Sequence, residues 1–214
     1  MRIAFLAYRG WALSIVETLA KENEVSVFKS PEEASSQKIS AFKPQLIFVA
    51  GWSWLIPREV LKIAPAIGLH PSMLPKYRGG SPIQHQIIRG EKTGGVTLFH
   101  VSEKLDKGEI AFQEEMSLDG HLDKVFDRIS ALGLKLFRKT ISSYPGIPAN
   151  QQDEKLATYF KRRKPEESEI TARDFETKSA EELYNFVRAL EDPYPNAFLK
   201  TRDNRKLFFK RADL

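Results

Sequence analysis

The chain has 214 residues, which is enough for one ordinary domain with a small appendage. Hydrophobic residues make up 42% and charged residues 29%, which is typical of a soluble domain with a sizeable core. The absence of cysteine excludes disulfides, thiolate metal sites and thiolate nucleophiles.

The net charge of +5 comes from basic residues that are spread along the chain. The densest run, KRRK at 161–164, is typical of a solvated linker, so the charge argues against a nucleic-acid partner and suits an anionic small substrate. The N-terminal apolar run is too short for a secretory signal, and no apolar stretch approaches the ~20 residues that span a membrane. We therefore expect a cytoplasmic protein without a membrane partner.

The first 70 residues alternate short apolar runs with segments of helical spacing. Predicted strands at 2–7, 25–28, 45–50 and 66–69 are separated by predicted helices at 11–20, 31–42 and 57–63. This alternation predicts an α/β fold with a mostly parallel twisted sheet and helices on both faces. Gly10 occupies the first strand-to-helix turn, where phosphates commonly bind. The three-glycine fingerprint is missing, so we do not predict NAD.

A long loop punctuated by proline and glycine, residues 71–82, follows the fourth strand. The next predicted elements are a helix at 82–89, two strands at 96–101 and 109–118 that form an antiparallel hairpin across an acidic turn, and a long amphipathic helix at 122–144. We divide the chain into a catalytic domain at 1–148, a connector at 149–178 and a C-terminal extension at 179–214. The extension is predicted to hold a helix at 179–190 and strands at 198–200 and 206–209.

His70 and Asp106 are the candidate catalytic residues, because each falls where a strand gives way to a loop. Imidazole exchanges a proton near neutral pH, and loops as long as 71–82 are usually functional. Taken alone, Asp106 is better explained by ordinary turn chemistry, since Asp-Lys-Gly is a common turn sequence. Since parallel strands end at one edge of a sheet, where such sheets bind ligands, we expect the two side chains to lie side by side.

Other candidate residues favour plainer interpretations. His85, His100 and His121 show no spacing with carboxylates that indicates a metal site, and we expect them on the surface or on helix faces. Ser72 and Ser81 lack the context of a nucleophilic serine. Four aromatic residues could wall a ligand pocket but are expected in the core: Trp52, Trp54, Phe99 and Phe112.

One stretch carries a specific resemblance: GLHPSMLPKYRGGSPIQHQIIRGEKTGGVTLFHVSEKLDKGEI. Its H-P-S-x-L-P-x-x-R-G string, followed by G-V-T and L-D-x-G-x-I, closely resembles the 10-formyltetrahydrofolate-dependent formyltransferases. That superfamily includes enzymes acting on methionyl-tRNA, glycinamide ribonucleotide and nucleotide-linked amino sugars. The resemblance implies a Rossmann-like domain that moves a formyl group from folate to an amine.

The resemblance also implies roles for individual residues. His70 and Asp106 match the family's catalytic histidine and aspartate, whereas Gly68 stands where the family has an asparagine that donates to the oxyanion. Ser72 or an ordered water could substitute for that donor, or could support the loop. The folate cosubstrate is expected against Trp54, Leu55 and Ile56 and against Ser102, Glu103, Lys104, Leu105 and Asp106. Contacts with the amine-bearing substrate are expected from Gly10, Lys76, Tyr77 and Arg78; no metal is expected.

The acceptor amine is predicted from the chain's ending. Only 44 residues follow Ile170, fewer than the barrel of the tRNA enzyme needs, and RALEDPYPNAF resembles the sugar-formylating branch. We therefore predict a nucleotide-linked amino sugar as the acceptor. The alternatives are another amine such as methionyl-tRNA, a folate- or nucleotide-binding relative impaired by Gly68, and a formylfolate hydrolase. A homodimer through the C-terminal segment is expected, consistent with Tyr184, Phe186 and Phe198.

Overall fold

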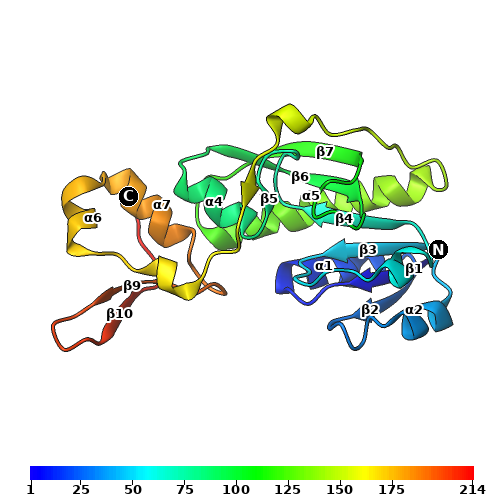
Figure 1. The fold of residues 1–214 in the computed structure, drawn as a ribbon, viewed down its shortest axis with the longest axis horizontal. Helices are drawn as coiled ribbons and strands as arrows, with labels where there is room; N and C mark the ends of the chain where they lie inside the picture. Colours follow the sequence, from blue (N-terminus) through cyan, green and yellow to red (C-terminus); the bar gives the residue numbers. More distant parts are fainter.

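The computed structural model describes all 214 residues, and a six-stranded sheet in the order β2-β1-β3-β4-β6-β7 forms its centre (Figure 1). The strands are β1 (Arg2–Leu6), β2 (Glu24–Phe28), β3 (Leu46–Ala50), β4 (Ala66–His70), β6 (Thr93–His100) and β7 (Ile110–Ser117). Strands β2, β1, β3 and β4 are parallel, while β6 runs antiparallel to both β4 and β7. The predicted α/β fold and the antiparallel hairpin are confirmed.

Helices cover both faces of the sheet because side chains of each strand alternate between the faces. On one face, Ile3 and Phe5 of β1 join a cluster of 24 buried residues with α1 (Gly10–Leu19) and α5 (Leu122–Ser143). On the other face, Ala4 and Leu6 belong to a cluster of nine buried residues, which also includes side chains of α2 (Ser36–Phe42) and α3 (Arg58–Leu61). No helix is long and apolar enough to cross a membrane.

Two predicted helices are shorter than expected. The helix predicted at 31–42 begins only at Ser36, because the Ser35 hydroxyl caps it by accepting from the Lys38 amide. The helix predicted at 57–63 is the four-residue α3, which ends before Pro65, a residue that disfavours helical backbone at the position preceding it.

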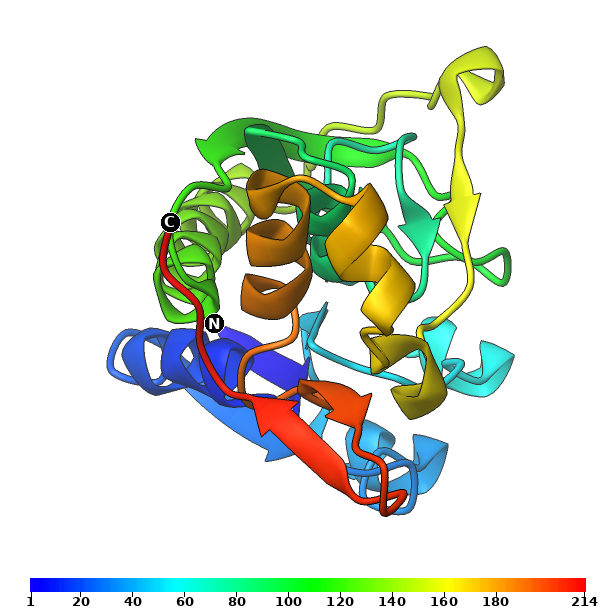
Figure 2. The same ribbon diagram turned by 90° about the vertical axis from the view of Figure 1, so that its left-hand side faces the viewer.

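The C-terminal extension forms a small unit at one end of the molecule, opposite the edge that carries β2 and α2 (Figures 1 and 2). Its helix α7 (Ala180–Arg188) packs against α4 (Pro82–Ile88), and β9 (Ala197–Lys200) pairs antiparallel with β10 (Lys206–Phe209) as predicted. A short helix, α6 (Ala172–Thr177), was not predicted. Phe198 is buried in this unit and offers no surface to the homodimer, which stays a prediction.

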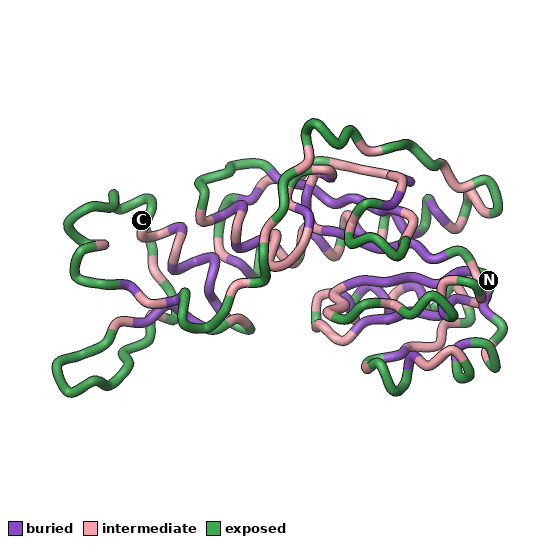
Figure 3. Tube along the Cα trace, in the orientation of Figure 1, coloured by how far each residue is buried: buried purple, intermediate pink, exposed green.

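The connector is attached to the catalytic domain by a strand pair that was also not predicted. Residues Tyr159–Phe160 form β8, which pairs in parallel with β5 (Arg78–Gly79) in the middle of the long loop. Single-turn 3-10 helices at Glu154–Leu156 and Pro165–Ser168 flank it. Much of the connector's backbone is exposed (Figure 3), but Arg78, which faces it from β5, is fully buried.

Candidate active site

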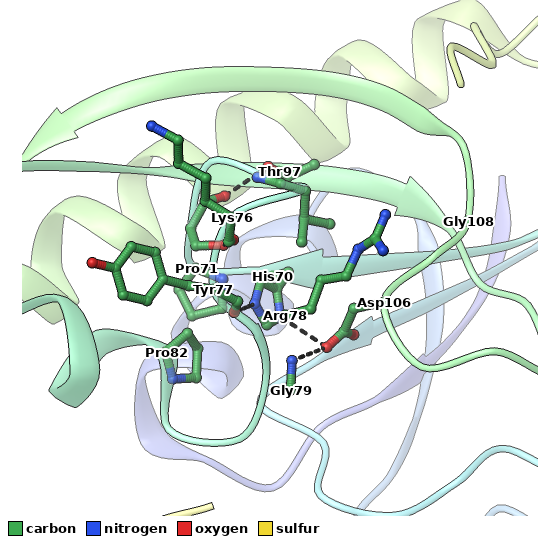
Figure 4. Close-up of polar contacts among 12 residues, drawn as sticks. His70, Pro71, Lys76, Tyr77, Arg78, Gly79, Pro82, Thr97, Asp106 and Gly108 are labelled. Carbon is green, nitrogen blue, oxygen red and sulfur yellow. Dashed lines mark hydrogen bonds and ion pairs between the residues drawn. The ribbon is translucent and has the colours of Figure 1, made fainter. Parts of the chain in front are cut away.

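His70 is fixed at the end of β4, a strand buried along its whole length between β3 and β6. Its Nε2 atom lies 2.7 Å from the carbonyl oxygen of Tyr77. A carbonyl can only accept, so Nε2 carries the hydrogen and donates it. The other ring nitrogen, Nδ1, faces the carboxylate of Asp106, with 3.7 Å between Nδ1 and Oδ2 (Figure 4). The structure thus brings the two predicted catalytic side chains together.

The reason for this proximity differs from the one expected. Because β6 is antiparallel to β4, with His100 opposite Ile67, the end of β6 lies beside the beginning of β4. The segment between β6 and β7 then folds back toward His70, and the expectation of neighbouring parallel strand ends was wrong. Asp106 has a φ of 51°, a left-handed conformation that Asp tolerates, and its Oδ2 accepts from the Gly79 amide at 2.8 Å.

The start of the long loop, just after His70, is held by a buried hydrogen-bond network. The Ser72 hydroxyl donates to the carbonyl of Lys76 at 2.7 Å, and the Thr97 hydroxyl donates to the carbonyl of Ser72 at 2.7 Å while accepting from the Leu74 amide. Ser72 and Thr97 are fully buried. Of the two roles considered for Ser72, these contacts favour support of the loop, because the buried hydroxyl donates its hydrogen to the Lys76 carbonyl.

The predicted substrate-contacting residues occupy three different environments. Lys76 is exposed, whereas the ring of Tyr77 stacks on Phe160 and its hydroxyl donates to Glu91 at 2.7 Å. Burial, together with this contact to Glu91, raises the pKa of Tyr77 to about 12. Gly10 begins α1 and lines a cavity of about 490 Å³ between α1, α5 and the turn after α7.

The structure does not favour the predicted contact between Arg78 and the substrate, because the Arg78 side chain is surrounded by other parts of the protein. Its guanidinium is fully buried, and all three of its nitrogens are paired within the protein. Nε and Nη2 donate to the Oε1 atom of Gln152 at 3.0 and 2.6 Å, Nη2 also lies 2.9 Å from Glu154 Oε1, and Nη1 donates to the Tyr159 hydroxyl. These partners lie in the connector, where the sequence shows only a polar stretch without periodicity, so no sequence signal marks them.

Gly68 lies in β4 opposite Phe99 of β6, and that ring occupies the space beside it. A Cβ atom built on Gly68 would lie 2.9 Å from Phe99 Cε1 and 3.1 Å from Val101 Cγ2. The position therefore has no room for a larger side chain unless Phe99 moves. The absence of a side-chain donor at this position is built into the packing of the sheet.

Arg58, at the start of α3 just after the first segment predicted to hold folate, forms an ion pair with Glu103 of the second segment, with 2.9 Å between Nε and Oε1. The two segments differ little in exposure. They expose large apolar side chains: Trp54 is 44%, Leu55 80% and Leu105 57% accessible. Ser102 and Lys104 are also exposed, while Ile56 packs against the sheet. Phe99 is buried and Phe112 packs against the core, as expected. Trp54 was expected in the core as well, but it is exposed and lies in an aromatic cluster with Tyr8 and Trp52.

The remaining histidines join separate parts of the chain. His85 bonds to the carbonyl of Lys161 at 3.0 Å, and burial lowers its pKa. His100 bonds to the carbonyl of Pro148 at 2.9 Å, and His121 Nδ1 lies 2.7 Å from Glu191 Oε1. All three are half-buried rather than free surface residues. The structure contains no group of three or more His, Asp or Glu that could hold a metal ion.

Comparison with known proteins connects this site to a family. Residues 8–141 match the family model described as formyl transferase, and residues 163–214 match the formyl transferase C-terminal domain. The methionyl-tRNA formyltransferase of Lysinibacillus sphaericus is 38% identical over 174 residues, which are 78% of this chain and 54% of that protein. The chain thus spans about half the length of this curated relative.

Solved structures extend the similarity to the whole chain. A methionyl-tRNA formyltransferase from Clostridium thermocellum superposes with a TM-score of 0.90 at 29% identity, covering 100% of this chain and 93% of that one. A sugar N-formyltransferase from a Shewanella species gives a TM-score of 0.78 at 19% identity, covering 100% and 98%, and shows the shared fold alone. The matched family models cover most of the sequence, including His70 and Asp106, and the chain belongs to the formyl transferase family.

Proposed function

We propose that this protein transfers a formyl group from 10-formyltetrahydrofolate to a primary amine, with His70 and Asp106 as its catalytic residues. The observation that carries this proposal is the His70–Asp106 pair. An imidazole and a carboxylate, both largely removed from solvent, face each other across 3.7 Å in a chain of the formyl transferase family. General acid–base groups need this proximity, and a buried site strengthens their electrostatic effect.

The reaction requires one bond to form and one to break. The neutral amine attacks the formyl carbon, negative charge develops on the formyl oxygen, and the attacking nitrogen becomes positive. Asp106 accepts the proton from that nitrogen, directly or through His70 Nδ1, which has no other hydrogen-bond partner. The intermediate then collapses by breaking the bond to N10 of the folate, and N10 leaves with the proton that Asp106 or His70 took from the amine. The pair therefore serves a proton transfer at the attacking amine.

His70 and Asp106 are prepared for this by their other contacts. Tyr77 accepts from His70 Nε2, so in the neutral ring Nδ1 keeps its lone pair and faces the site. Gly79 donates to Asp106 Oδ2, which keeps one carboxylate oxygen in place. Protonated Nδ1 can donate to the developing oxyanion, and this supplies a donor that Gly68 cannot.

For the donor, the exposed faces of Trp54, Leu55 and Leu105 provide apolar surface for a flat pterin ring. The ion pair between Arg58 and Glu103 connects the start of α3, just after Trp54 and Leu55, to the turn that carries Leu105. This is the position that the sequence resemblance predicts for 10-formyltetrahydrofolate. Backbone groups of Leu55 and Ser102 would add directional hydrogen bonds to the ring edge.

For the acceptor, the sequence relatives favour aminoacyl-tRNA, since the curated relative at 38% identity is a methionyl-tRNA formyltransferase. The nucleotide-linked amino sugar predicted from RALEDPYPNAF is the second candidate. Both acceptors are anionic and fit the net charge of +5. An impaired folate-binding relative is the third alternative, motivated by Gly68.

The test is a mass-spectrometric assay with 10-formyltetrahydrofolate and two sets of acceptors: methionyl-tRNA, and a panel of uridine- and thymidine-linked amino sugars. We expect one set to gain a single formyl group, and we expect His70→Ala and Asp106→Ala to abolish the gain. Asp203→Ala removes an exposed carboxylate in the turn before β10 and is the matched control. Folate binding without any formylated product would overturn the proposed activity in favour of a binding protein.

A further inference from the structure

Gln152 lies at the centre of a hydrogen-bond network that links the connector to the catalytic turn. Its Nε2 atom donates to the carbonyls of Asp106 and Gly108 at 2.9 and 2.6 Å. Its Oε1 atom accepts from Nε and Nη2 of Arg78. The carbonyls can only accept and the guanidinium can only donate, so the chemistry of the partners fixes the orientation of the amide. Gln152 uses both ends of its side chain within the protein.

The segment on the other side of this network touches both catalytic residues. Arg78 is flanked by Tyr77, whose carbonyl accepts from His70, and by Gly79, whose amide donates to Asp106 (Figure 4). The backbone of Arg78 is fixed from the connector, since its amide donates to the carbonyl of Thr158 at 2.9 Å. Gln152 therefore ties the turn of Asp106 to the same short strand that orients His70.

The turn that carries Asp106 needs such a tie. Asp106 adopts a φ of 51°, and the four residues before it are exposed. The carboxylate itself has one backbone donor, Gly79. Without Gln152, the carbonyls of Asp106 and Gly108 would lose their donor, and rotation of the turn would carry the carboxylate away from His70 Nδ1.

We propose that Gln152 is a positioning residue for the transfer reaction, acting by holding the Asp106 turn against Arg78. This inference rests on the proposed function for its catalytic consequence, but the positioning itself does not depend on the identity of the acceptor. The expected signature is a loss of kcat that exceeds any change in KM, because Gln152 contacts the carbonyls of Asp106 and Gly108 and not the exposed Trp54, Leu55 and Leu105 proposed to bind folate. A displacement of about 1 Å at a reacting group costs on the order of 100-fold in rate.

Gln152→Glu separates the two halves of the network. The new carboxylate still accepts from Arg78, which keeps the buried guanidinium paired, but it cannot donate to the carbonyls of Asp106 and Gly108. We expect kcat to fall by about 10- to 100-fold with KM changing less than about 3-fold. Gln151→Ala is the matched control, because Gln151 is exposed and its side chain contacts only Glu109, so its kcat should stay within about 2-fold of the parent.

Amide hydrogen exchange tests the positioning without any turnover. The Gly79 amide donates to the Asp106 carboxylate, whereas the neighbouring Arg78 amide donates to Thr158. In Gln152→Glu we expect Gly79 to exchange at least about 10-fold faster and Arg78 to keep its protection. Equal acceleration of both amides would show general loosening of the β5–β8 pair, and unchanged Gly79 protection with unchanged kcat would show a passive residue. Either result overturns the proposal.

The two measurements also separate this inference from the proposed function. If the parent protein formylates no acceptor while Gly79 alone loses protection in Gln152→Glu, the activity is wrong and the positioning of Asp106 stands. If the parent is active and Gln152→Glu is as active, the function stands and Gln152 has no part in it.

Discussion

His70 and Asp106 face each other in one site, yet the protein holds them by different means. His70 is the last residue of a strand buried between two neighbours, and its ring is oriented by a carbonyl seven residues away. Asp106 lies in a turn with left-handed backbone and depends on Gly79, 27 residues away, and on Gln152, 46 residues away. One side of the site is fixed by the sheet and the other by side chains from the connector.

This difference has a consequence for how each side tolerates change. A sheet strand is held by backbone hydrogen bonds and by packing on both faces, so a substitution there mainly changes the stability of the domain. A turn held by a few side-chain hydrogen bonds can move without unfolding the domain, so a substitution there mainly changes the geometry of the site. The connector, which the sequence indicates is a linker, therefore supplies contacts to the turn that carries Asp106.

The largest effect is expected from the pair itself. His70→Ala removes the ring, and Asp106→Asn removes the charge while keeping an oxygen for the Gly79 amide. Each should lower kcat by about 10²- to 10⁴-fold, since this is the usual contribution of a positioned acid or base. Steady-state kinetics of formyl transfer is the measurement. Full turnover in either variant would remove that residue from the mechanism.

Gly68→Asn tests the strand side. The new side chain would meet the Phe99 ring, and overpacking of this kind costs about 1–3 kcal/mol in the free energy of unfolding. Phe99→Leu in the same chain opens space, so the double variant should lose less than the sum of the two single variants in urea unfolding. A rate gain in the double variant alone would identify a missing oxyanion donor. Strict additivity in stability would contradict the contact between the two positions.

The smallest effect is expected on the connector side, from Glu154. Hydrogen bonds from Arg78 and Lys107 lower its pKa from 4.5 to about 2. Because the folded-state pKa is depressed, the stabilisation is present above pH ~4.5 and is lost as the pH falls toward 2. The parent should have a higher melting temperature than Glu154→Gln at pH 7, and the difference should shrink through this window. A gap that is constant with pH would exclude the ion pair as its cause.

Much of the fold could be predicted from residue patterns. Apolar runs such as those of β1 and β3 are buried on both sides of the sheet, and α5 shows its apolar stripe in the sequence. The lengths of two helices were overestimated, because a serine cap decides where α2 begins and a following proline limits where α3 ends. The two-residue strands β5 and β8 carry no periodic signal and form only through pairing across 81 residues, Arg78 with Tyr159.

The candidate site divides in the same way. His70, Asp106 and the unusual Gly68 could be found from motif spacing. The burial of Arg78 and the role of Ser72 in the loop could not, because a charged residue in a Gly-rich loop has the same sequence signature whether it faces a substrate or another part of the chain.

By itself the sequence determined the α/β order of elements, the family and the two candidate catalytic residues, because burial periodicity and motif spacing are local properties. The tertiary structure decided how those side chains meet. An antiparallel β6 sends its turn back along β4, Phe99 fills the space beside Gly68, and the connector supplies Gln152 to a turn 46 residues away. These arrangements depend on contacts between distant segments, whose partners are chosen only when the chain is packed.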